Sequence, residues 1–197
     1  MYARALHPRV QERTQETGLL GAEPHRVPHS FGLTRGQERF MQIGVYGAGY
    51  LGTVISACLA DFGTPVTCCH PDSLQMVEMA QGNIPFFEKN LSEVIRRNVR
   101  CGRLVYSTDI ESFARKAQFI FLAEDSPIGL AELAIRVATP AAKPPILSIV
   151  TPVPVGTARE VERRLQEAGV KATVVSQPVF FTPGDRPNSN VRLREYP

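Results

Sequence analysis

The chain has 197 residues, enough for one domain of ordinary size with a single buried core. Hydrophobic residues make up 43% of it, which is typical of a globular protein and too high for a disordered one. The net charge of +3 is too small to indicate a nucleic-acid partner. No apolar run approaches the roughly 20 residues that cross a bilayer, and no signal-peptide pattern opens the chain. We therefore expect no membrane partner and a cytoplasmic location.

Residues 1–40 differ in composition from the rest of the chain. They hold six arginines and three of the four histidines, and no helical or strand period persists among them. Their four glutamates argue against an organellar transit peptide, which is poor in acidic residues. We expect a flexible extension over 1–40, a folded domain over 41–181 and an irregular, turn-rich tail over 182–197.

From Met41 the chain alternates between short apolar runs, typical of strands, and segments with apolar residues at helical spacing. In chain order the sequence predicts a strand at 42–46, a helix at 50–62, a strand at 65–69, helices at 73–81 and 91–101, a strand at 104–107, a helix at 110–117, a strand at 119–122, a helix at 130–139, a strand at 146–150, a helix at 157–168 and a strand at 172–175. Gly63 is expected to end the first helix.

Strands that alternate with helices indicate parallel pairing, because a parallel neighbour requires a long crossover connection. The strands are almost continuously apolar, which is typical of a parallel sheet covered on both faces. Six such strands predict a Rossmann-type α/β fold, a doubly wound parallel sheet in the order 3-2-1-4-5-6, and leave no room for a second domain.

The strongest motif is a glycine loop that follows the first strand and opens the first helix, with the sequence Gly47-Ala48-Gly49-Tyr50-Leu51-Gly52. The first glycine permits a tight turn, the second lets a pyrophosphate approach the backbone, and the third lets the helix pack closely on the strand. The helix N-terminus offers unpaired N–H groups and a partial positive charge to phosphates. We therefore predict that these six residues bind a dinucleotide.

The end of the second strand should carry Asp or Glu for the adenosine ribose, but His70 stands there, followed by Asp72 two positions later. Three interpretations remain open: Asp72 reaches the ribose, a protonated His70 tolerates a 2′-phosphate, or NAD binding is weak or lost. We include both residues in the predicted cofactor site, with NAD as the expected cofactor and NADP not excluded.

Other polar groups indicate no separate site. The spacing of the four cysteines matches no zinc pattern and predicts buried free thiols in a reducing compartment, with no metal bound. Four arginines near one helix end and the acidic pair Glu124-Asp125 are expected to be solvated surface groups. The arginines are Arg96, Arg97, Arg100 and Arg103.

A series of motifs in order resembles the N-terminal NAD-binding domain of the UDP-glucose/GDP-mannose dehydrogenase family over about residues 41–181. The matching pieces lie at 43–52, 58–63, 66–68, 82–88, 102–104, 108–109 and 153–157. Full-length members oxidise the 6-hydroxymethyl group of a nucleotide sugar to a carboxylate with two NAD per turnover. The resemblance implies that chemistry only where the functional residues are retained.

Several functional positions of the family carry other residues here. The strand-2 aspartate falls on His70, the threonine that helps hold the catalytic water falls on Pro152, and the functional glutamate falls on Val179. In the EPGL motif Glu88 and Leu91 remain, while Lys89 and Asn90 replace Pro-Gly. The nucleophilic cysteine lies in the family's C-terminal half, and none of the four cysteines here occupies its place.

We therefore name no catalytic residue, and expect a truncated, divergent domain that binds a dinucleotide but does not oxidise a nucleotide sugar alone. One alternative is an active NAD-dependent oxidoreductase completed by a partner chain that carries the missing half, and only then would a nucleotide sugar be bound. The other is a non-enzymatic interaction module on the same scaffold.

Overall fold

The computed structural model describes residues 41–124, 126 and 128–177, which form one parallel sheet with helices on both faces. The predicted extension over 1–40, the predicted tail over 182–197, and the positions Asp125 and Val179 lie outside the described residues.

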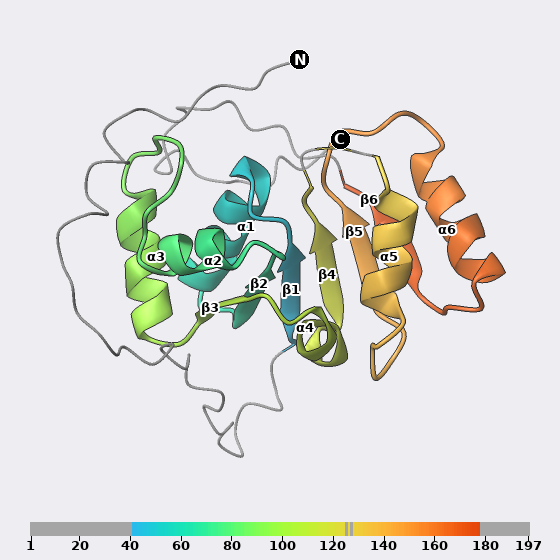
Figure 1. Cartoon of the computed structure of the whole chain (residues 1–197), viewed down its shortest axis with the longest axis horizontal. Helices are drawn as coiled ribbons and strands as arrows, with labels where there is room; N and C mark the ends of the chain where they lie inside the picture. The colour runs from blue at the N-terminus through green and yellow to red at the C-terminus, as the bar shows by residue number, and fades with distance from the viewer. Residues whose placement is uncertain (1–40, 125, 127, 178–197) are drawn as a thin grey trace, which may run out of the picture. The chain divides into compact units, whose positions relative to one another are not determined.

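The strand order is β3-β2-β1-β4-β5-β6, with every neighbouring pair parallel, so the predicted doubly wound sheet is confirmed (Figure 1). The elements are β1 (Ile43–Tyr46), α1 (Tyr50–Asp61), β2 (Val66–Cys69), α2 (Ser73–Ala80), α3 (Leu91–Arg100), β3 (Leu104–Ser107), α4 (Ile110–Lys116), β4 (Phe119–Leu122), α5 (Leu130–Ala138), β5 (Ile146–Ile149), α6 (Thr157–Glu167) and β6 (Thr173–Ser176).

Each helix ends one residue before its predicted end, because the last residue of each predicted range is the C-cap. Phe62 is the C-cap of α1, and Gly63 follows it with positive φ and donates its N–H to the Ala60 carbonyl. The expectation that Gly63 ends this helix is therefore confirmed.

The core lies on both faces of the sheet. On one face α1 and α3 pack against β1, β2 and β3 through residues such as Ile55, Ile95 and Val66. On the other face α4, α5 and α6 pack against β4, β5 and β6 through residues such as Phe113 and Leu147. Because helices cover both faces of the sheet, the loops that follow the strands gather at its carboxyl edge.

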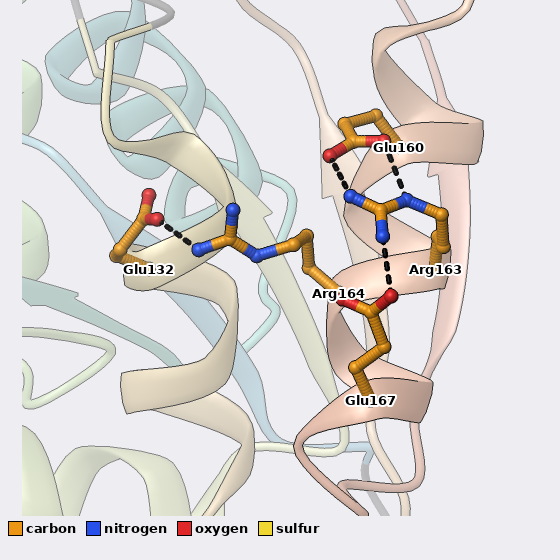
Figure 2. Close-up of polar contacts among 5 residues, drawn as sticks. All are labelled: Glu132, Glu160, Arg163, Arg164 and Glu167. Carbon is orange, nitrogen blue, oxygen red and sulfur yellow. Dashed lines mark hydrogen bonds and ion pairs between the residues drawn. The ribbon is translucent and has the colours of Figure 1, made fainter.

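Exposed ion pairs lie on the outer helices α5 and α6, and one of them joins the two helices (Figure 2). Arg164 of α6 contacts Glu132 of α5 at 2.5 Å. Within α6, Arg163 contacts Glu160 at 2.6 Å and also pairs with Glu167. All five side chains are at least 40% exposed, so solvent screens these pairs and they add little to stability.

Candidate functional site

The glycine loop leaves β1 at the carboxyl edge of the sheet, where the strand order reverses between β1 and β4. Backbone hydrogen bonds fix the start of this turn to both neighbouring strands, β2 and β4. Gly47 donates its N–H to Cys69 O at 3.0 Å, and Ala123 donates its N–H to Tyr46 O at 2.8 Å. In doubly wound folds this reversal opens the crevice in which ligands bind.

Gly47 and Gly52 stand where no other residue fits. Gly47 has φ +120°, and a Cβ placed on it would lie 2.4 Å from Ala123 O. A Cβ on Gly52 would lie 2.1 Å from Gly47 O. Both contacts are with backbone atoms, so a side chain at either position would displace the turn. The roles expected for the first and third glycines, a tight turn and close packing of the helix, agree with this geometry.

Gly49 is the N-cap of α1 and has no side chain to satisfy the N–H groups of the first helical turn. Tyr50 and Leu51 follow it in this turn and are half-buried. No acidic residue lies in the turn, so the positive end of the helix dipole is not neutralised from within α1. This helix entrance has the chemistry that binds an anion.

Three side chains hold the carbonyl groups of the loop. Gln75 Nε2 donates to Ala48 O at 3.0 Å, and Thr53 Oγ1 donates to Gly49 O at 2.7 Å. The buried Cys68 thiol lies 3.6 Å from Gly47 O. Sequence reasoning named none of these supports, because Gln75 and Cys68 lie 27 and 21 residues from their partners.

Tyr50 also joins the loop to the segment that precedes α3. Its hydroxyl donates to Glu88 Oε1 at 2.8 Å, and its ring meets the ring of Phe86 edge-on with centroids 5.0 Å apart. Glu88 is 8% exposed. The sequence shows that Glu88 is retained in the EPGL motif, although Lys89 and Asn90 replace Pro-Gly there. It does not show that Glu88 contacts Tyr50.

The end of β2 carries His70 and Asp72 next to each other. Asp72 is the N-cap of α2, and its Oδ1 accepts the Gln75 N–H at 3.0 Å. His70 Nδ1 accepts the Asp72 N–H at 3.3 Å. The Asp72 carboxylate thus has a structural partner on α2.

A hydrogen bond joins the turns that follow β4 and β5 at the carboxyl edge of the sheet. Thr151 is buried, and its Oγ1 donates to the Glu124 carbonyl at 2.5 Å. Pro152 next to it is exposed. The apolar side chains of Ile128 and Val155, in the loops that follow these strands, are fully or almost fully exposed.

Tyr46, the last residue of β1, lies under these turns. Burial raises the pKa of its hydroxyl, Arg136 opposes that shift, and Glu124 adds to it. Arg136 donates to the Tyr46 hydroxyl oxygen at 2.6 Å. The phenol is therefore a neutral structural group at physiological pH.

The cysteines and arginines differ partly from expectation. All four cysteines are free, and Cys68 and Cys69 are buried as predicted, but Cys58 is only half-buried and Cys101, the C-cap of α3, is exposed. Among the arginines, Arg97 stays 55% exposed yet contacts Asp61 at 2.5 Å. Arg103 donates to Asn98 Oδ1 at 2.9 Å.

The described residues contain neither a metal-binding cluster nor a membrane-spanning helix. No three His, Cys, Asp or Glu side chains gather there in a way that could hold a metal ion. No helix in that part of the chain has the length and apolar character needed to cross a membrane.

Comparison with known proteins agrees with this architecture. The NAD-binding domain of the UDP-glucose/GDP-mannose dehydrogenase family matches residues 41–191. UDP-glucose 6-dehydrogenase from Rhizobium meliloti (strain 1021) is 36% identical over 73% of this chain and 36% of its own length. UDP-glucose 6-dehydrogenase TuaD from Bacillus subtilis (strain 168) is 31% identical over 73% of this chain and 34% of its own length.

Among solved structures, a ternary complex of GDP-mannose dehydrogenase from Pseudomonas aeruginosa has the same fold, with a TM-score of 0.67 and 20% identity over 73% of this chain and 37% of that one. This chain spans about a third of the length of the curated relatives that it matches. Its family match covers more than half of the sequence. The chain therefore belongs to the UDP-glucose/GDP-mannose dehydrogenase family and carries its domain for a nicotinamide dinucleotide cofactor.

Proposed function

We propose that a domain over residues 41–181 binds NAD through Gly47, Ala48, Gly49, Tyr50, Leu51 and Gly52, and that this chain alone does not oxidise a nucleotide sugar. One observation carries the binding proposal: the turn excludes a Cβ at Gly47 and Gly52, and it presents an uncapped helix entrance at the strand-order reversal. A turn of this kind lets a pyrophosphate approach the backbone closely.

At the ribose end of the site we expect weak binding. The Asp72 carboxylate accepts a hydrogen bond from α2, and His70 offers no carboxylate to the two ribose hydroxyls. Loss of such hydrogen bonds costs roughly 1–3 kcal/mol, about a tenfold to hundredfold loss of affinity.

We also propose NAD rather than NADP as the cofactor. Asp72 and Asp109 cap the helices after β2 and β3, so the edge beside His70 carries carboxylates. A 2′-phosphate there would be repelled by like charges.

Two features support the lack of activity of the isolated chain. Pro152 has no hydroxyl, and the Thr151 hydroxyl beside it donates its proton to Glu124 O, so neither side chain has a proton to donate to a water. The domain matches only about a third of the length of its relatives, and no cysteine here stands in the position of the family's nucleophile.

A second candidate function is an active oxidoreductase completed by a partner chain. Ile128 and Val155 favour it, because they are 91% and 107% exposed on the two loops beside the predicted cofactor site. Coverage of these two side chains by another domain or subunit would remove apolar surface from water. A nucleotide sugar would then be bound only in the completed assembly.

Calorimetric titration of the purified chain with NAD and with NADP tests the binding proposal. We expect weak, saturable NAD binding, weaker NADP binding, and no NAD binding by the Gly49→Val variant, whose side chain would stand at the helix entrance. Circular dichroism should show that Gly49→Val remains folded. Absence of NAD binding by the wild-type chain would favour a non-enzymatic interaction module, and unchanged affinity of Gly49→Val would exclude this loop as the site.

A further inference from the structure

We infer that Gln75 is a positioning residue for the dinucleotide site: its carboxamide holds the Ala48 carbonyl and thereby orients the peptide that leads into α1. The inference rests on the proposed function of the loop. The observation that carries it is the 3.0 Å hydrogen bond from Gln75 Nε2 to Ala48 O, which joins α2 directly to the loop.

Gln75 is well placed to act as a fixed support. Asp72 caps the start of α2 by accepting the backbone N–H of Gln75 at 3.0 Å. Met76 and Met79, at most 4% exposed, pack α2 against Ala48. The backbone at position 75 is therefore held on both sides, and its half-buried side chain needs to reach only a short distance to the loop.

The carbonyl of Ala48 has one other side-chain donor within reach, and it is weaker. Thr53 Oγ1 lies 3.4 Å from Ala48 O but only 2.7 Å from Gly49 O, so its hydroxyl proton is directed mainly to Gly49. Gln75 is thus the principal side-chain partner of the Ala48 carbonyl among the described residues.

The orientation of this carbonyl matters because a trans peptide is planar and its N–H points opposite to its C=O. When Gln75 holds Ala48 O toward α2, the N–H of Gly49 is directed away from α2. The same constraint limits the rotation of the backbone that enters the first turn of α1. Donors held in place before a ligand arrives bind it without an ordering cost, so loss of the Gln75 contact should weaken pyrophosphate binding.

Two substitutions at Gln75 and two matched controls test the inference. Gln75→Leu removes the donor without adding charge, and Gln75→Glu keeps the shape but replaces the donor with an acceptor. Gln81→Leu and Gln81→Glu make the same changes at the exposed C-cap of the same helix. We expect Gln75→Leu to weaken NAD binding roughly three- to tenfold, the range for loss of one neutral hydrogen bond. Gln75→Glu should weaken it at least as much, and both Gln81 variants should bind like wild type.

Amide NMR spectra of the ligand-free, ¹⁵N-labelled chain separate positioning from direct contact. We expect the Gly49 and Tyr50 amide signals to shift in both Gln75 variants and in neither Gln81 variant. Reduced NAD affinity without shifted loop signals would mean that Gln75 touches the ligand directly and would overturn the inference. Normal affinity of Gln75→Leu would overturn it too, since an effect of Gln75→Glu alone would report only charge.

The same experiments keep this inference apart from the proposed function. If the wild-type chain fails to bind NAD, the proposed function fails, while the ligand-free spectra still report whether Gln75 orients the loop. Circular dichroism of each variant checks that the domain is folded, and Gln75→Glu retains the volume of glutamine if Gln75→Leu does not fold.

Discussion

His70 and Asp72 at the end of β2 determine how the adenosine ribose could be held. We expect His70→Asp to raise NAD affinity by roughly tenfold, because a carboxylate at this position can accept hydrogen bonds from both ribose hydroxyls. Calorimetric titration of the variant against wild type measures the change.

Asp72→Ala is the matched control for that prediction. Because Asp72 caps α2 and accepts the Gln75 N–H, its removal should cost about 1 kcal/mol of stability and weaken NAD binding no more than Gln75→Leu does. If Asp72→Ala weakens NAD binding more than Gln75→Leu does, while His70→Asp has no effect, Asp72 holds the ribose and our interpretation of this strand end is wrong.

The four free thiols should differ widely in reactivity. Burial raises the pKa of Cys68 and of Cys69 to about 12, so neither forms an appreciable amount of thiolate in the folded chain. Burial also raises the pKa of Cys58, whereas Cys101 is exposed. With Ellman's reagent we expect fast modification of Cys101 and modification of Cys68 and Cys69 only on unfolding. Cys101→Ser should remove the fast phase, and a fast phase that persists would contradict the assignment.

At the scale of elements, Asn98 joins α1 to α3. Its fully buried side chain donates to Asp61 Oδ1 at 3.1 Å and accepts from Arg103 Nε at 2.9 Å. Asn98→Ala should lower the free energy of unfolding by about 1–3 kcal/mol, because it removes the hydrogen bonds that the buried Asn98 side chain makes to Asp61 and Arg103. Urea denaturation measures this. The control Glu132→Ala removes an exposed pair and should cost less than about 1 kcal/mol. Equal losses in both variants would contradict the argument.

At the scale of the whole molecule, this chain matches about a third of the length of its curated relatives. We expect no NADH formation from UDP-glucose and NAD by the purified chain, because it offers no counterpart of the thiolate that forms the covalent intermediate. A full-length relative, assayed in parallel, is the positive control. Turnover by this chain alone would refute the prediction, and turnover only after a candidate partner chain is added would favour the completed oxidoreductase.

Much of the architecture was predictable because it depends on local patterns. Short apolar strands and amphipathic helices differ in period, and helix-ending residues such as Gly63 mark boundaries, so element types and order followed from neighbouring residues. The strand order followed from the arrangement that six such strands adopt in doubly wound folds. The glycine loop was recognisable because its backbone geometry demands glycine wherever it occurs.

What sequence alone determined is therefore the family, the doubly wound sheet and the glycine loop, together with the substitutions at His70 and Pro152. Only the tertiary structure decided how the loop is supported. The bonds from Gln75 to Ala48 and from Tyr50 to Glu88 join residues 27 and 38 positions apart. Such pairs meet only after α2 and the segment before α3 have packed on the sheet. Local periodicity and helix or strand propensity do not predict which side chains will then lie within 3 Å of each other, about the length of a hydrogen bond.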